Sequence, residues 1–300
     1  FRRSQGVAVF LHFGKEISDM MVKHISIEVT SKQTKKPVFG GPADLTAYIL
    51  EPVDGILDKK RPAVLLCPGG GYRTLSTRED QPIAMKYLAA GFHVFVLHYS
   101  LAPDVFPRAL MELALAMKVI REHGDEWNVD VDRIAVSGFS AGGHLACCLG
   151  VFWDREWLYG ALGVKPEMIR PDGMILCYPV ITSGEYCHKG SFECLMGAEA
   201  SKKDEKLRRL LSLEYQVGPQ VPKTFLWHTW TDQSVPVENS LLLLQALRKA
   251  GVNVEAHLYP VGPHGIALGT EETQGIDQKY LEPYCDSWMG LAIRWIEKQL

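Results

Sequence analysis

The segment RIAVSGFSAGGHLACCLGV, residues 133–151, carries the strongest structural signal in the chain. A strand is predicted over residues 133–137 and an apolar helix over 141–151, and between them GFSAG has the form G-x-S-x-G. A serine on a tight strand-to-helix turn takes strained backbone angles, and flanking glycines leave room for the close approach of the chain. The helix that follows directs its first amides at the position of an oxyanion. We therefore predict that Ser140 is a nucleophile. The alternative is an ordinary glycine-rich turn.

A second glycine-rich segment, PGGGY at residues 68–72, follows a short apolar strand predicted over residues 63–67. Three consecutive glycines allow the backbone to turn two amides toward one point, as a developing oxyanion requires. The alternative is a phosphate-binding loop. The segment lacks both the Lys-Ser/Thr pair and the G-x-G-x-x-G spacing of such loops. We therefore favour an oxyanion loop.

Candidate acid and base residues follow in the chain order Ser, Asp, His. Asp232 comes just after a strand predicted over residues 223–228, and His264 lies in GPHG, after a strand predicted over 254–259. Both residues are therefore expected on loops at the carboxyl ends of strands, where distant positions converge. The alternatives are a capping or turn aspartate and a turn histidine. His144, one turn into the apolar helix, is expected to be a hydrogen-bonded, semi-buried histidine rather than a catalytic one.

Strands and helices alternate along most of the chain, which predicts an α/β fold with a mostly parallel central sheet and helices on both faces. Two opening antiparallel strands are expected over residues 24–30 and 45–50. Residues 180–222 break the alternation, and we expect them to form an excursion over the carboxyl edge of the sheet. The other predicted elements are strands at 92–99 and 173–178 and helices at 78–90, 107–123, 236–250 and 284–299.

The composition limits the class of protein. A net charge of −3 and the absence of a dense Lys/Arg run argue against nucleic acid and anionic membrane as main partners. No segment approaches the ~20 apolar residues of a membrane span. The seven cysteines lack zinc-ligand spacing, so no metal is expected, and most should be reduced and buried. A disulfide between Cys187 and Cys194 is the alternative.

The chain is expected to form one catalytic domain, residues 22–300, after an N-terminal extension, residues 1–21, of uncertain status. The extension begins Phe1-Arg2-Arg3 and continues with a short apolar run. It resembles a weak signal peptide, but no small-residue cleavage site follows the run. We favour a cytoplasmic protein.

These motifs together resemble the α/β-hydrolase superfamily, specifically its esterase/lipase branch of acetyl-xylan-esterase-like and hormone-sensitive-lipase-like proteins. The matching segments are GGGY at 69–72, YSLAP at 99–103, GFSAGGHLA at 138–146 and DQSVP at 232–236, and the resemblance covers about residues 24–300. Two residues depart from the pattern. Pro68 replaces the usual His, which favours the acetyl-xylan-esterase-like side, and Ser100 replaces a usual Arg. The resemblance implies oxyanion donors from the amides of Gly70, Gly71 and Ala141, no cofactor, and carboxylic esters as substrates.

The expected activity is hydrolysis of short-acyl esters, and the expected reaction is deacetylation of a carbohydrate or a similar small alcohol. No long amphipathic lid helix is evident, and aromatic residues gather near the expected mouth of the site. A peptidase and a non-catalytic binding protein on the same fold are the alternatives, although the chain leaves no room for the extra domain usual in such peptidases. The oligomeric state is not predicted by the sequence. The aromatic residues expected to contact substrate are Tyr72, Trp153, Tyr178, Tyr186 and Trp230.

Overall fold

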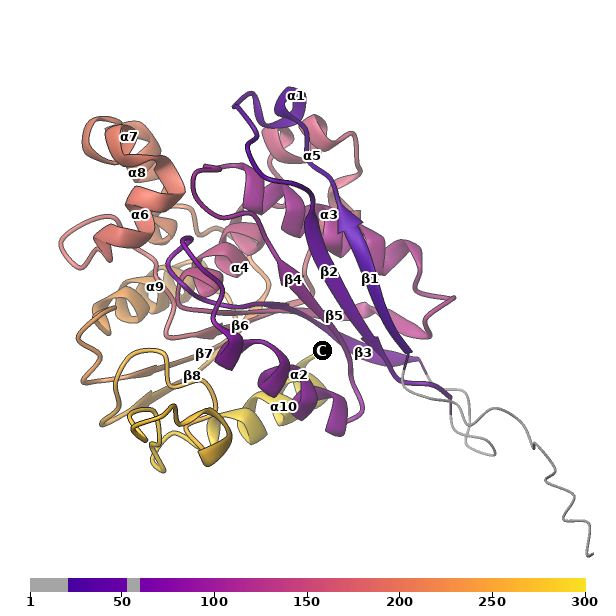
Figure 1. Cartoon of the computed structure of the whole chain (residues 1–300), viewed down its shortest axis with the longest axis vertical. Coiled ribbons are helices and arrows are strands. Elements are labelled where there is room, and N and C mark those ends of the chain that lie inside the picture. The colour runs from indigo at the N-terminus through magenta and orange to yellow at the C-terminus, as the bar shows by residue number, and fades with distance from the viewer. Residues whose placement is uncertain (1–20, 53–59) are drawn as a thin grey trace, which may run out of the picture.

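A central sheet of eight strands organises the structure, a computed structural model that describes residues 21–52 and 60–300 (Figure 1). The order across the sheet is β1-β2-β4-β3-β5-β6-β7-β8. Strand β2 is antiparallel to both of its neighbours, and every other adjacent pair is parallel. The predicted mostly parallel sheet with antiparallel opening strands is confirmed. The strands are β1 (Met21–Ile27), β2 (Ala43–Ile49), β3 (Arg61–Cys67), β4 (His93–His98), β5 (Val129–Phe139), β6 (Gly173–Cys177), β7 (Lys223–Thr229) and β8 (Val254–Tyr259).

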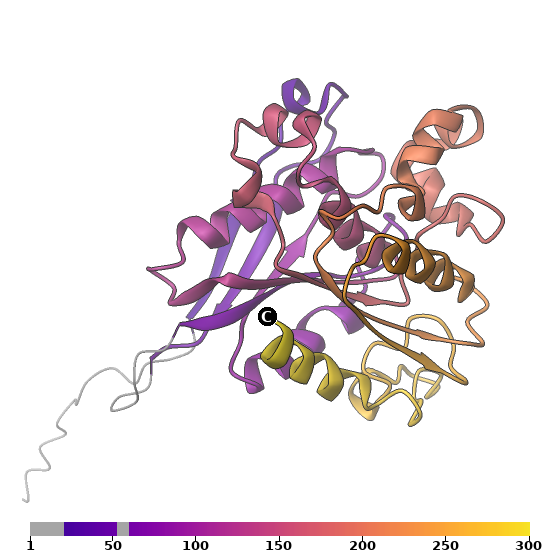
Figure 2. The same cartoon turned by 180° about the vertical axis from the view of Figure 1, so that it is seen from behind.

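Helices cover both faces of the sheet because its inner strands are apolar on both sides. Helices α2 (Gln81–Ala89) and α10 (Trp288–Gln299) pack on one face with their own cluster of buried side chains. Helices α3 (Arg108–Glu122), α4 (Ala141–Phe152) and α9 (Glu238–Lys249) pack on the other face (Figures 1 and 2). The two cores fix the sheet between them, so the loops at its carboxyl edge start from rigid strand ends.

The register of the central strands brings the predicted motifs together. Gly138 on β5 pairs with Cys67 on β3, and Phe139 pairs with Cys177 on β6. The glycine-rich loop after Cys67 and the serine turn after Phe139 therefore leave the sheet side by side. Strand β7 lies next to β6 and leads to the Asp232 loop, and β8 follows beside it. Parallel strands thus place three separate sequence motifs at one edge of the sheet.

The predicted excursion, residues 180–222, contains three short helices and one 3₁₀ turn. They are α6 (Lys189–Met196), α7 (Ala198–Lys203), α8 (Glu205–Leu211) and η3 (Leu213–Tyr215). None of these helices exceeds eight residues, in agreement with the expected absence of a long lid helix in this segment.

Several element boundaries differ from the sequence prediction. The helix predicted from residue 78 begins at Gln81, because η1 (Thr77–Glu79) forms a separate 3₁₀ turn before it. The closing helix begins at Trp288 rather than at 284. Outside the excursion, four short helical elements were not predicted: α1 (Ser31–Thr34), α5 (Glu156–Leu162), η2 (Pro166–Ile169) and η4 (Glu271–Thr273). Each is too short for a helical periodicity to show. The predicted N-terminal extension, apart from Met21, lies outside the described residues.

All seven cysteines are free thiols, so the alternative of a disulfide between Cys187 and Cys194 is wrong. Six of them are buried, and Cys187 is half-buried. Within the described residues, no helix combines the length and the apolar character that crossing a bilayer would require.

Candidate active site

Ser140 occupies a strained turn between β5 and α4. Its backbone has φ of 52° and ψ of −117°, a conformation that L residues rarely adopt. Hydrogen bonds to neighbouring strand ends hold it there: Ser140 N–H donates to the Cys177 carbonyl at 3.0 Å, and its carbonyl accepts from Val180 N–H at 3.0 Å. Gly138 and Gly142 are needed because a Cβ at either position would collide with backbone atoms of Gly142 or Cys67. The turn therefore presents the serine hydroxyl above the sheet edge.

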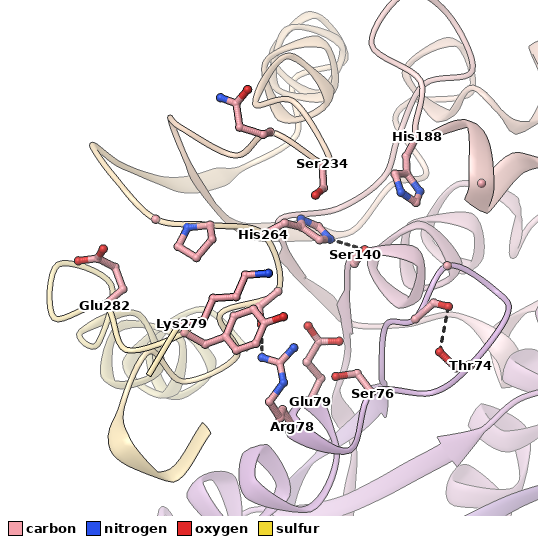
Figure 3. A pocket seen from close by; sticks show the side chains of 18 of the residues that line it. Thr74, Ser76, Arg78, Glu79, Ser140, His188, Ser234, His264, Lys279 and Glu282 are labelled. Atoms are coloured by element: carbon pink, nitrogen blue, oxygen red, sulfur yellow. Dashed lines mark hydrogen bonds between the residues drawn. The ribbon is translucent and has the colours of Figure 1, made fainter. Parts of the chain in front are cut away.

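A chain of two short hydrogen bonds joins Ser140 to His264, as Figure 3 shows, and His264 to Asp232. Ser140 Oγ lies 2.7 Å from His264 Nε2, and His264 Nδ1 lies 2.6 Å from Asp232 Oδ2. A carboxylate oxygen accepts, so Nδ1–H donates to Asp232 and Nε2 is left with the lone pair that faces the serine hydroxyl. This arrangement can remove the serine proton during attack on a carbonyl carbon.

Asp232 is buried and accepts four hydrogen bonds. Ser234 N–H and Val235 N–H each donate to Oδ1 at 2.9 Å, and His228 Nε2 lies 3.3 Å from Oδ2, the oxygen that also binds His264. Burial alone raises the pKa of Asp232, but the bonds from His228 and His264 outweigh it and hold the pKa well below its ordinary value. The carboxylate is therefore ionised where it contacts His264.

The glycine-rich loop after β3 places two amides beside the serine. Gly70 and Gly71 have φ of 129° and 68°, and both line the same cavity as Ser140. Their N–H groups donate to no atom in the described part of the chain. They are thus free to bind a substrate oxygen, as is expected of the first amides of α4.

Ser140 opens into a cavity of about 900 Å³ that is lined mainly by glycines and by residues with polar or charged side chains (Figure 3). Among the described residues that line it, none is Leu, Ile, Val, Met or Phe. The wall comes from the glycine loop, the start of the excursion, the Asp232 loop and the segment after His264. The side chains that contribute charge or hydrogen-bonding groups besides Ser140 and His264 are Arg73, Thr74, Ser76, Arg78, Glu79, His188, Thr231, Gln233, Ser234, Lys279, Tyr280 and Glu282.

The five aromatic residues predicted to contact substrate are not among the lining residues. Tyr72 and Tyr178 turn into the protein interior, with exposed fractions of 2% and 1%. Tyr72 OH bonds to His144 Nδ1 at 2.9 Å, and Trp153 Nε1–H donates to the Gln220 carbonyl at 3.0 Å, so these rings serve packing and hydrogen bonding away from the cavity. Tyr186 and Trp230 also lie outside the wall, although Trp230 is 58% exposed. Tyr280 is the aromatic residue that does line it.

His144 is hydrogen-bonded, as predicted, but is fully buried rather than semi-buried, and it plays no part in the bonds around Ser140 Oγ. Its Nδ1 bonds to Tyr72 OH and its Nε2 donates to the Leu211 carbonyl, each at 2.9 Å. Burial lowers the pKa of His144 to about 4, so the ring is neutral at pH 7. His228 is likewise buried and faces Asp232, Val235 and Ser240.

Sequence reasoning missed several residues of the cavity wall. His188 starts α6, where its Nδ1 accepts from Ser191 N–H at 3.3 Å, and burial lowers its pKa. Lys279 and Tyr280 come from the irregular segment after the His264 loop, and Glu79 from the 3₁₀ turn after the glycine loop. Only their proximity in sequence to a motif pointed to them. No group of three or more His, Cys, Asp or Glu side chains that could hold a metal occurs among the described residues.

Comparison with known proteins adds independent findings. The sequence model of the BD-FAE family matches residues 56–247. The chain is 36% identical over 223 residues to endo-1,4-beta-xylanase B of Butyrivibrio fibrisolvens, covering 72% of this chain and 34% of that protein. It is 28% identical over 255 residues to the acetylxylan esterase of Xylanibacter ruminicola, covering 84% and 49%. The chain thus spans about a third and about half of the length of these relatives.

Two solved structures are similar over nearly the whole chain. An acetyl ester-xyloside bifunctional hydrolase from Caldicellulosiruptor lactoaceticus superposes with a TM-score of 0.76 at 33% identity, covering 92% of this chain and 95% of that one. A carboxylesterase from Lactobacillus plantarum superposes with a TM-score of 0.80 at 32% identity, covering 93% and 98%.

Proposed function

The chain belongs to the BD-FAE family, in the esterase/lipase branch of the α/β-hydrolases, and from this premise we propose that it is a serine esterase acting on short-acyl carboxylic esters. The natural reaction we propose is deacetylation of a carbohydrate or a similar small alcohol. Residues 22–300 act as one catalytic domain, and the reaction needs no cofactor.

The observation that carries the proposal is the hydrogen-bonded chain from Ser140 through His264 to Asp232 at the floor of the cavity. In the first half-reaction, Ser140 Oγ bonds to the ester carbonyl carbon while its proton passes to His264 Nε2. The carbonyl oxygen, now negative, accepts hydrogen bonds from the amides of Gly70, Gly71 and Ala141. The carbon–oxygen bond to the alcohol then breaks, and His264 protonates the departing alkoxide.

The second half-reaction restores the serine. Water attacks the acyl-enzyme carbonyl while its proton passes to His264 Nε2, and the same amides hold the second oxyanion. The bond to Ser140 Oγ then breaks, the serine recovers its proton from His264, and the short carboxylic acid departs. Asp232 keeps its negative charge throughout, so it stabilises the imidazolium in both steps.

The wall of the cavity supports a short acyl group and a polar alcohol. A long acyl chain gains affinity by burying methylenes against apolar side chains, at roughly 0.8 kcal/mol each. The described wall offers Pro263 and Tyr280 as its apolar groups, among many charged and hydroxyl side chains. Such a wall suits the hydroxyls of a sugar. The names of two similar proteins, an acetylxylan esterase and an acetyl ester-xyloside hydrolase, support the same choice.

The test combines labelling with a substrate panel. A serine-reactive phosphonate should label the wild-type chain at Ser140, as located by peptide mass spectrometry. Turnover should be measured on acetylated xylo-oligosaccharides, on 4-nitrophenyl esters from two to twelve carbons, and on a peptide amide. We expect turnover of the acetyl esters. Labelling at another residue, or peptide cleavage without ester turnover, would contradict the proposal.

A further inference from the structure

Glu79 is a buried carboxylate directly beneath the Ser140 site. It ends the 3₁₀ turn after the glycine-rich loop, lines the cavity, and has an exposed fraction of 2% (Figure 3). Gly69 N–H donates to Glu79 Oε2 at 2.9 Å, and Tyr178 OH donates to Glu79 Oε1 at 2.7 Å. Among the described residues, no Lys, Arg or His forms an ion pair with it. Burying a carboxylate without a cationic partner lowers the stability of the fold, so we expect the residue to have a functional role.

The directions of the hydrogen bonds show that both oxygens of Glu79 act as acceptors. Ala267 N–H lies 2.9 Å from Tyr178 Oη, and an amide can only donate. Tyr178 therefore accepts from Ala267 and points its own proton at Glu79 Oε1. Two donors thus converge on the Glu79 carboxyl group, one from the glycine loop and one from the tyrosine.

These bonds tie together the two loops that serve Ser140. Gly69 is confined between Glu79 and the nucleophile: a Cβ there would lie 2.6 Å from Glu79 Oε2 and 3.1 Å from Ser140 Cβ. On the other side, Ala267 is three residues after His264, and the Tyr178 ring packs edge-on against the His264 ring at 5.2 Å between centroids. Arg78, the neighbour of Glu79, adds a hydrogen bond to the Gly265 carbonyl.

We propose that Glu79, through Tyr178, is a positioning residue that holds the oxyanion loop and the His264 loop against Ser140. The proposal rests on the esterase function proposed above. Among the described residues that line the cavity, Glu79 is the buried carboxylate.

Glu79→Gln is the main test. A glutamine offers one acceptor and one donor to a place where two donors meet, so one loop must shift. We expect kcat on 4-nitrophenyl acetate to fall about 10²-fold with KM little changed, since a displacement of the order of 1 Å has such an effect. General loosening of the site would raise KM as well as lower kcat, so the split between the two constants separates positioning from structural damage.

Tyr178→Phe is a second, conservative variant that removes the link and keeps the charge. We expect kcat to fall about tenfold to a hundredfold with KM little changed, because the variant loses the two buried hydrogen bonds of the hydroxyl, one to Glu79 and one from Ala267. The double variant should cost no more than Glu79→Gln alone, since both act through one chain of bonds.

Matched controls are available in the same fold. Tyr87 is also fully buried but does not line the cavity, so Tyr87→Phe should leave kcat unchanged. Glu214→Gln changes a half-buried glutamate of the excursion, which accepts from Thr182 Oγ1 at 2.7 Å, and should leave both kcat and KM unchanged. Unchanged kcat in both Glu79→Gln and Tyr178→Phe, or additive losses in the double variant, would overturn the inference. An inactive wild type that the phosphonate does not label would instead overturn the proposed esterase function.

Discussion

Replacing Asp232 with asparagine removes the negative charge that orients His264 and keeps the size and shape of the side chain. Ser234 N–H and Val235 N–H, which both donate to Oδ1 at 2.9 Å, would hold the carbonyl oxygen of the new side chain in that position. The amide NH₂ must then take the place of Oδ2, which lies 2.6 Å from His264 Nδ1. Two donors would face each other there. His264 can relieve the conflict only by moving its proton from Nδ1 to Nε2.

The magnitude follows from this change of tautomer. With the proton on Nε2, the imidazole has no lone pair for the Ser140 proton 2.7 Å away. The imidazolium of the transition state also loses a buried negative partner. Loss of both contributions costs about 10⁴ in kcat, which corresponds to about 5.4 kcal/mol of barrier.

The assay is steady-state hydrolysis of 4-nitrophenyl acetate by Asp232→Asn, with thermal unfolding measured on the same sample. Asp204→Asn is the matched control, because Asp204 caps α8 by accepting from Leu207 N–H at 2.9 Å and asparagine caps equally well. We expect a folded, nearly inactive Asp232 variant and an unchanged Asp204 variant. A folded Asp232→Asn enzyme that keeps more than a tenth of wild-type kcat would refute the reasoning.

Three further predictions address the nucleophile, the acyl group and stability. Ser140→Ala should lose on the order of 10⁴–10⁶ in kcat while remaining folded, and retention of more than a small fraction of activity would place the nucleophile elsewhere. Across 4-nitrophenyl esters, kcat/KM should peak at two to four carbons, and a peak at eight or more would show an apolar acyl site that the cavity lacks. Burial lowers the pKa of both His93 and His144 to about 4, below the unfolded value near 6.5. The unfolded chain therefore binds more protons between these values, and the free energy of unfolding should fall as the pH drops from 6.5 to 4. His98 opposes this in part, because its hydrogen bond to Asp80 raises its pKa. Urea unfolding across this range tests the sign, and a stability that rose toward pH 4 would contradict it.

The predicted candidates Ser140, Asp232 and His264 meet in the structure because each follows a strand of the parallel sheet, and strand ends share an edge. That inference needs only the order of elements and short turn motifs, both of which are local in sequence. The fold class was predictable for the same reason, since apolar strands alternate with helices over most of the chain.

The wall of the cavity was not predictable in the same way. Tyr72 and Tyr178 stand next to the motifs, yet φ values of 58° and 37° occur at these residues and their rings pack inward. Nearness in sequence says which loop a residue belongs to but not which side of the loop it faces. Lys279 and Tyr280 lie in a segment without helical or strand periodicity, so their place in the wall follows from tertiary packing alone.

The seven unpaired thiols give the chain a built-in set of chemical reporters. Alkylating reagents attack the thiolate, and burial raises the pKa of Cys187 to about 11, that of Cys285 to about 12, and that of Cys67 further still. These three thiols should therefore resist alkylation in the native protein, and each becomes reactive only when its surroundings open. Cys187 lies in the excursion, Cys285 just before α10, and Cys67 at the end of a central strand. The order in which these three cysteines become alkylated as the urea concentration rises would show which part of the molecule opens first, with no engineered probe.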